Sequence, residues 1–165
     1  MNGIISYLTG LYKGNIMKQN IINIEASSCG GGNISCLVSD DVEDNFYTDD
    51  EKNAWVLFDF KTYRVRITDY SIKTYDYNKD NNHLKNWVLE VSNNKSDWEI
   101  IDTRSNDSSL NRRSVCSSFE INQPNNNNEN YRFIRIRLTG KNWKNLNYLV
   151  FYSIEFYGHI KGNYD

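Results

Sequence analysis

Carboxylates are the reactive side chains that lie closest together in this sequence. The segment 40–51 contains Asp40, Asp41, Glu43, Asp44, Asp49, Asp50 and Glu51. Calcium is bound in proteins by six to eight oxygen ligands from carboxylates, backbone carbonyls and water. The segment therefore has two interpretations, a calcium-binding loop and a solvated acidic loop, of which we favour the second.

Arginines in two short runs form a second candidate group. Arg64 and Arg66 are two residues apart, as are Arg135 and Arg137, so each pair would share one face of a strand. Guanidinium groups donate paired hydrogen bonds to carboxylates and phosphates. If the two strands are neighbours, the four side chains would form a cationic stripe for a partner. Otherwise they would pair with local acids and keep a sheet face soluble.

Aromatic side chains in polar segments form a third group. Tyr75 and Tyr77 lie in one polar stretch, and Trp143 precedes Lys144 in another. Exposed aromatic rings stack on sugar rings or anchor protein interfaces. Packing of each ring under its own loop is the alternative, and we give the two equal weight.

The sequence shows no set of residues typical of a catalytic site. His83 and His159 are far apart, and neither belongs to a nucleophile, acid–base or zinc-ligand pattern. The run 30–32 is Gly-Gly-Gly, but it lacks the strand–helix context that a phosphate-binding loop requires. We therefore expect a protein that is not an enzyme and that requires no cofactor, with structural calcium as the one ion to consider.

Length and charge further limit the classes of protein to which the chain can belong. The chain has 165 residues, the usual size of one domain, with a net charge of -2 and a pI of about 5.7. This balance predicts no charge-driven binding to nucleic acid or anionic membranes. No apolar run approaches the roughly 18 residues of a membrane span, and no secretion signal is recognisable. Together with an odd number of cysteines, these features predict a cytoplasmic protein with free thiols.

Alternating apolar and polar residues recur along the chain and predict an all-β fold. In the run 87–92 every second residue is apolar, so we expect Glu90 and Ser92 to face solvent. By the same pattern Trp55 and Ile134 are expected in the core. The other expected strands are 21–26, 55–60, 64–67, 70–74, 98–102, 115–121, 132–138 and 148–156.

These strands predict a single antiparallel β-sandwich of the jelly-roll type. We expect the sandwich at 21–160, after a lead-in segment at 1–20 and before a short tail at 161–165. No stretch with helical periodicity competes with the strands.

Four segments in the same order resemble the discoidin family, the coagulation factor 5/8 type C domains of the galactose-binding-like superfamily. They are Trp-Val-Leu-Phe-Asp-Phe at 55–60, the hairpin from Trp87 to Trp98, Tyr-Arg-Phe-Ile-Arg at 131–135 and Ile-Glu-Phe-Tyr-Gly at 154–158. The resemblance covers the chain from about residue 21 to residue 158. It implies the galactose-binding-like β-sandwich with binding loops at its ends.

The resemblance also implies a place for calcium. It brings the acidic segment to one rim of the sandwich near Glu155, so that Asp40, Asp44, Glu155 and nearby carbonyls would hold the ion. Many members of the family have Asp-Gly after the apolar pair that stands here at 37–38. This chain has Ser-Asp-Asp instead, so the metal pattern is altered.

The family's cellular roles suggest two functions. Extracellular members commonly join their terminal strands by a disulfide, and the absence of cysteines near either end of the domain supports an intracellular branch. Cytosolic members serve in ubiquitin-ligase and ciliary transport assemblies. We therefore expect a non-catalytic scaffold module that binds other proteins. A carbohydrate- or anionic-lipid-binding module is the alternative.

Overall fold

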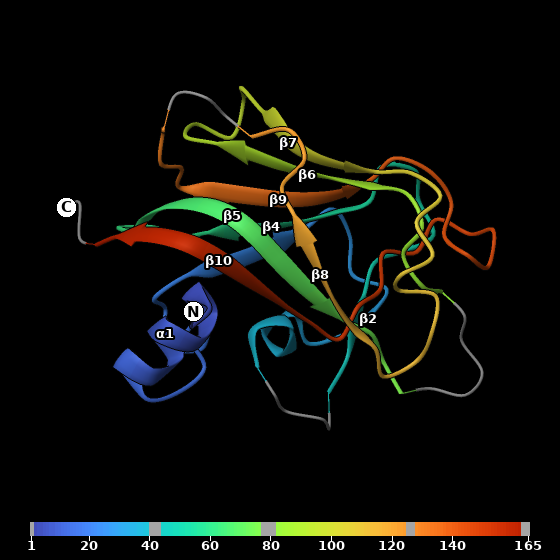
Figure 1. Ribbon diagram of the computed structural model, residues 1–165. Helices are drawn as coiled ribbons and strands as arrows, with labels where there is room; N and C mark the ends of the chain where they lie inside the picture. The colour runs from blue at the N-terminus through green and yellow to red at the C-terminus, as the bar shows by residue number, and fades with distance from the viewer. Residues whose placement is uncertain (1, 40–43, 77–81, 125–127, 163–165) are drawn as a thin grey trace.

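The computed structural model describes residues 2–39, 44–76, 82–124 and 128–162 (Figure 1). Two antiparallel sheets lie face to face. The larger has the strand order β1-β4-β9-β6-β7 and the smaller has the order β10-β5-β8, while β2 and β3 form a separate short ladder. The predicted all-β antiparallel sandwich is thus confirmed.

The strand bounds follow the alternating runs with some shifts. The strands are β1 (Asn23–Ala26), β2 (Gly31–Gly32), β3 (Phe46–Tyr47), β4 (Trp55–Asp59), β5 (Arg64–Lys73), β6 (Trp87–Ser92), β7 (Glu99–Arg104), β8 (Cys116–Glu120), β9 (Phe133–Leu138) and β10 (Ser153–Lys161). The two runs expected at 64–67 and 70–74 are one continuous strand. The run expected at 148–156 becomes a strand only at Ser153, because before it only the isolated bridge between Val150 and Tyr47 forms.

The core lies between the two sheets and is rich in aromatic rings. Phe156 of β10 packs edge-on against Phe58 of β4 and against Phe60 just after that strand, at centroid distances of 5.3 and 6.2 Å. Trp87 of β6 meets Phe119 of β8 in the same way at 5.3 Å. These contacts join strands that are far apart in sequence, so the sandwich closes only when both sheets are formed.

Two helical segments were not expected. The helix α1 (Ile4–Tyr12) lies against β10, and the 3-10 helix η1 (Ile34–Val38) contacts β10, β1 and β3. Ile4, Ile5 and Leu8 are buried in the common core. Their spacing places them on one face of a helix. The lead-in therefore belongs to the same core as the sandwich, although the expected domain limits themselves stay a prediction.

The inner and outer sides of β6 also differ from the expectation. All six residues of this strand are buried, including Glu90 and Ser92, which were expected to face solvent. Long side chains from the neighbouring strands cover the outer side of the sheet. Alternation therefore identified the inner face correctly, but the outer face is not solvated here.

No helix among the described residues is long and apolar enough to cross a membrane.

Candidate functional site

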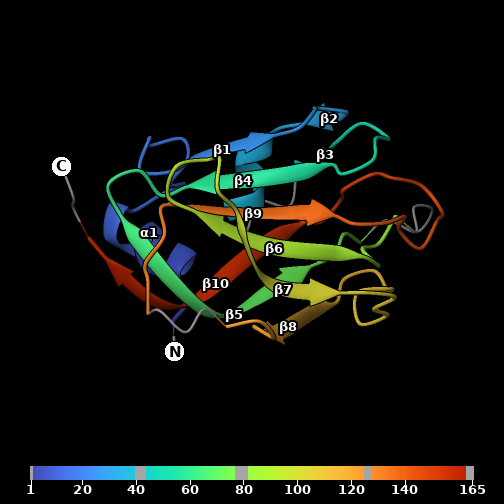
Figure 2. The same ribbon diagram turned by 90° about the horizontal axis from the view of Figure 1, so that it is seen from above.

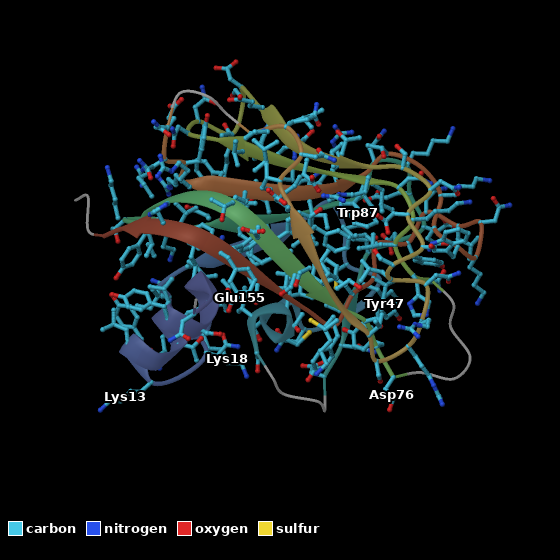
Figure 3. All side chains as sticks on the ribbon, in the orientation of Figure 1. Lys13, Lys18, Tyr47, Asp76, Trp87 and Glu155 are labelled. Atoms are coloured by element: carbon cyan, nitrogen blue, oxygen red, sulfur yellow. The ribbon has the colours of Figure 1, made fainter. Side chains whose placement is uncertain are left out.

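A pocket of about 660 Å³ opens at one end of the sandwich. Its described lining comes from the β3 region, the end of β5 and the loops before β6 and β10, and consists of Asn45, Tyr47, Thr74, Tyr75, Asn82, His83, Lys144, Leu146, Tyr148 and Val150. Figure 3 shows Tyr47 and Asp76 on the opposite side of the molecule from Lys13 and Lys18 of the helical lead-in.

Three tyrosines form the aromatic part of the pocket. The rings of Tyr47 and Tyr148 meet edge-on with centroids 6.3 Å apart. Tyr75 packs edge-on against Tyr152 at 5.5 Å, and its hydroxyl oxygen accepts a hydrogen bond from the backbone N–H of Phe46 at 2.9 Å. The rings are therefore held in place before any ligand arrives.

A buried amide organises the loop beneath the pocket. Asn142 is almost fully buried, and its Oδ1 accepts hydrogen bonds from the backbone N–H groups of Lys144 and Leu146 at 3.0 and 3.1 Å. Its Nδ2 donates to Asn82 Oδ1 at 3.0 Å and to the carbonyl oxygen of Tyr148 at 3.2 Å. One side chain thus ties together the loops before β6 and β10, which both line the pocket.

The lining suits noncovalent binding of a polar molecule with apolar faces. The tyrosine rings offer flat surfaces, and Asn45 and Asn82 bring amide groups that can donate and accept. His83 is largely buried and Lys144 is exposed at the same pocket. Pockets of this volume and mixed lining are the usual form of small-ligand sites.

The structure brings part of the predicted aromatic group together. Tyr75 and Lys144 both line the pocket, and Tyr77 lies outside the described residues. Trp143 is half-buried beside the pocket, where its Nε1 donates to the carbonyl oxygen of Asp107 at 3.0 Å and Lys85 Nζ lies 4.6 Å from its ring centre. The binding role proposed for Trp143 stays a prediction.

The four arginines do not form one stripe, which corrects the first interpretation. Arg64 and Arg66 lie on β5 of the smaller sheet, whereas Arg135 and Arg137 lie on β9 of the larger one. Arg66 donates to Asn128 Oδ1 at 2.8 Å. The spacing of two residues predicts that the arginines of each pair share one face of their strand, but it carries no information on which strands are neighbours.

Arg135 and Arg137 share one carboxylate. Nε of Arg135 donates to Glu90 Oε2 at 2.8 Å, and Nε of Arg137 donates to Glu90 Oε1 at 3.1 Å. This local pairing is the alternative considered for these residues, and it explains why Glu90 tolerates burial.

A second ion pair on the same sheet contains an aspartate whose pKa is shifted. Burial alone would raise the pKa of Asp59, but hydrogen bonds from the Arg132 side chain and the Lys61 backbone N–H outweigh burial and lower it. Arg132 Nε lies 2.7 Å from Asp59 Oδ1.

The predicted calcium ligands have other partners in the structure. Asp40 lies outside the described residues, and Asp44 Oδ1 accepts a hydrogen bond from the backbone N–H of Asn45 at 2.8 Å. Glu155 accepts hydrogen bonds from the backbone N–H groups of Ile5 and Ser6 at 2.7 and 2.9 Å, so it acts as the N-terminal cap of α1. Within the described ranges no three His, Cys, Asp or Glu side chains form a metal-binding group. The calcium site stays a prediction.

Several residues of the pocket were missed by sequence reasoning. Asn45, Tyr47, His83 and Tyr148 come from segments interpreted as an acidic loop, a polar loop and a strand start. Asn142 gave no signal because asparagines are frequent throughout the chain. Tyr47 carried the clearest signal in the sequence, since it is an aromatic residue within a polar loop.

Comparison with curated proteins finds similarity in sequence to part of a ubiquitin ligase. No family model matches the chain. The E3 ubiquitin-protein ligase Ufd4 of Drosophila melanogaster is 30% identical over 127 residues, which cover 76% of this chain. The matched region is only 5% of the length of Ufd4. The similarity therefore concerns one small part of that protein.

Solved structures show the fold at low sequence identity. The module CpGH89CBM32-5 from Clostridium perfringens, in complex with GalNAc-β-1,3-galactose, matches with a TM-score of 0.65 and 11% identity over 85% of this chain and 97% of its own. The lectin domain of lectinolysin, complexed with Lewis B antigen, has a TM-score of 0.58 and 18% identity, with coverages of 83% and 92%.

A third structure agrees with these two. The family 32 carbohydrate-binding module of Clostridium perfringens NanJ, in complex with galactose, has a TM-score of 0.60 and 10% identity, and covers 87% of this chain and 96% of its own. The predicted fold agrees with these neighbours. The chain therefore has the antiparallel β-sandwich fold of these carbohydrate-binding and lectin domains, which is the fold that the discoidin resemblance implied.

Proposed function

We propose that this protein is a non-catalytic carbohydrate-binding module and that the pocket beside Tyr47, Tyr75 and Tyr148 holds the sugar. The observation that carries the proposal is the lining of this pocket, in which aromatic rings and side-chain amides surround a volume of about 660 Å³. The glycan complexes of structures with the same fold support it.

The chemistry of the lining matches the chemistry of a sugar. A pyranose ring presents C–H groups on its faces and hydroxyls around its edge. Aromatic rings cover the faces, and amides and hydroxyls pair with the edge. The position of Asn142 beneath the loop means that little ordering remains to be done on binding, which favours affinity.

The proposal is tested by glycan array followed by calorimetric titration of the best ligand. Tyr47→Ala and Tyr148→Ala should each weaken binding by about tenfold or more, because each removes a ring from the pocket. Their melting temperatures should stay close to that of the wild type, since both rings are only partly buried.

A matched control is Tyr7→Ala, which removes a half-exposed tyrosine from α1 far from the pocket. It should leave glycan binding unchanged. An array without any ligand, or equal affinity in all three variants, would exclude sugar binding at this pocket.

A second candidate function is the expected scaffold role within a larger protein assembly. It is supported by the similarity to part of Ufd4, a ubiquitin ligase. The cytoplasmic location expected from the sequence agrees with this candidate. The test is a pull-down from native lysate followed by identification of stoichiometric partners, with the Tyr47→Ala variant included. A partner retained by that variant would show that the protein contact lies outside the pocket.

A further inference from the structure

The outer face of the larger sheet presents a group of side chains outside the pocket. In Figure 2 the strands β1, β4, β9, β6 and β7 lie in front, and α1 lies behind them. Arg135 and Arg137 project from β9, Trp55 from β4, and Ile100 and Trp98 from β7 and the turn before it. We call Trp55, Trp98, Ile100, Arg135 and Arg137 the arginine face.

This side of the sheet carries an apolar layer of its own. Leu57, Val88 and Phe133 are buried, yet they lie outside the hydrophobic core between the sheets. The β6–β7 turn folds over part of this layer, since Lys95 reaches Glu25 of β1 at 3.0 Å. The arginine face lies next to this layer, since Leu57 pairs with Arg135 and Val88 pairs with Arg137 in the sheet.

Charges on this side are arranged in two levels. The Glu90 side chain is only 3% exposed, whereas those of Arg135 and Arg137 are 18% and 24% exposed. The Asp59 side chain is 10% exposed and its partner Arg132 is 38% exposed. In these ion pairs the carboxylate is therefore covered more fully than the guanidinium groups, so the pairs present positive charge outward. Because two arginines share Glu90, the cluster of these three side chains has a net charge of +1.

The guanidinium of Arg135 is held in place by stacking. Its carbon Cζ lies 3.9 Å from the ring centre of Trp98 and 5.9 Å from that of Trp55. Stacking of this kind orients the fork without using all its N–H groups. Ile100 adds an aliphatic side chain that is 40% exposed. Tryptophan and arginine are the residues most enriched among the energetic centres of protein interfaces.

We propose that the arginine face is a docking site for an acidic segment of a partner protein. Carboxylates of the segment would meet the partly exposed guanidinium groups, and an apolar side chain beside them would pack against Ile100 and Trp98. The inference goes beyond the proposed sugar binding and uses a different surface of the molecule. Each site can therefore fail independently of the other.

The test uses the full chain and a short synthetic peptide of glutamate and leucine residues. Binding is followed by NMR through the indole N–H signals of Trp55 and Trp98 and the Nε–H signals of Arg135 and Arg137. We expect these signals to shift on titration at low salt and the affinity to fall as salt is added. A lysine–leucine peptide of the same length should not shift them.

Two substitutions at one exposed position sharpen the test. Ile100→Lys and Ile100→Asp both remove the aliphatic contact but place opposite charges on the face, so the lysine variant should bind the acidic peptide about tenfold more tightly than the aspartate variant. Both retain the Glu90 ion pairs, so the fold is expected to survive. Tyr47→Ala in the sugar pocket is the control and should bind the peptide like the wild type.

Four outcomes would overturn the proposal. The first is the absence of shifts at millimolar peptide, and the second is an equal response to the lysine–leucine peptide. The third is an equal response to phosphate or to vesicles containing anionic lipid, which would indicate a general anion site. If Ile100→Lys and Ile100→Asp bind equally well, the peptide contacts another surface and the proposal fails as well.

Discussion

Tyr70, Trp87 and Asp102 form a polar network between the two sheets. The Tyr70 hydroxyl donates to Asp102 and accepts from Trp87 Nε1 at 2.9 Å. Arg104 completes the network with two hydrogen bonds to Asp102, at 2.9 and 3.0 Å. Burial raises the pKa of Tyr70, and the neighbouring Asp102 raises it further. The buried charge of Asp102 is tolerated because its hydrogen-bond partners Tyr70 and Arg104 are in position.

Stability should fall in alkali because several tyrosines resist ionisation in the fold. Burial and the hydrogen bond with Tyr12 raise the pKa of Tyr63 to about 12, and burial together with Glu99 raises that of Tyr131. A raised pKa gives stability that is complete below the ordinary value of 10.0 and is lost as pH rises toward the folded value.

We therefore expect the free energy of unfolding to decline from about pH 10 upward, measured by urea denaturation at a series of pH values. Tyr63→Phe should reduce this decline, because it removes one of the responsible groups. A stability that is flat to pH 11 would show that these hydroxyls are not held as described.

Trp55 and Ile134 were expected to share the core, but the structure separates them. Ile134 is fully buried between the sheets, whereas Trp55 is half-buried on the outer side of β4. Ile134→Ala should cost about 2–5 kcal/mol of unfolding free energy, because it leaves a cavity. Trp55→Ala should cost only about 1 kcal/mol, since it mainly loses the contact with Arg135. Equal losses by chemical denaturation would contradict this placement.

At the scale of elements, β10 depends on a glycine. The pairing of β10 with β5 shifts register between Tyr157 and Gly158. Gly158 has a φ of 143°, and a Cβ at this position would lie 2.2 Å from the carbonyl oxygen of Arg66. The closing motif of the resemblance thus ends in glycine for a physical reason, which is the bulge that lets the strand continue to Lys161.

Two alanine substitutions should have opposite effects. Gly158→Ala should destabilise the protein by at least about 2 kcal/mol, because both the backbone conformation and the contact oppose a Cβ. Gly10→Ala lies in α1 where a Cβ meets no other atom within 4 Å. It should stabilise the protein by about 0.5–1 kcal/mol. Thermal and urea denaturation of both variants measure the sign of the change in unfolding free energy. An unchanged stability of Gly158→Ala would show that the bulge does not require a glycine.

At the scale of the whole molecule, the helical lead-in and the sandwich share one core. Besides the residues of α1, Ile16 is fully buried in the same cluster. Glu155 of β10 binds the first turn of α1, and a Cβ on Gly3 would lie 2.0 Å from the Glu155 carboxyl carbon. The helix thus sits directly against the strand.

Removal of residues 2–20 should therefore unfold the protein or leave it marginal. Each buried aliphatic side chain in the deleted part contributes about 1.5–3 kcal/mol, and the sum approaches the total stability of a typical domain. The check is circular dichroism with thermal melting of the shortened chain. Cooperative melting close to that of the full chain would instead support a domain limited to 21–160.

The sequence alone determined the fold class and most of the strands. Alternation reports which side chains of a strand share a face, and this local property identified the strands β4, β6 and β9 and the inner residues of β6 and β9. The four family segments added the type of sandwich. The helix α1 was also present in the pattern of Ile4, Ile5 and Leu8, but a segment of nine residues is too short to give a clear helical period.

Only the tertiary structure decided the binding surfaces. The pocket joins Tyr47, Tyr75, His83 and Tyr148 through loops whose relative positions depend on sheet closure and on the amide of Asn142. In the same way, strand order separated Arg64 and Arg66 from Arg135 and Arg137. Periodicity describes one strand at a time, whereas a site depends on which strands and loops become neighbours, and long-range packing determines those contacts.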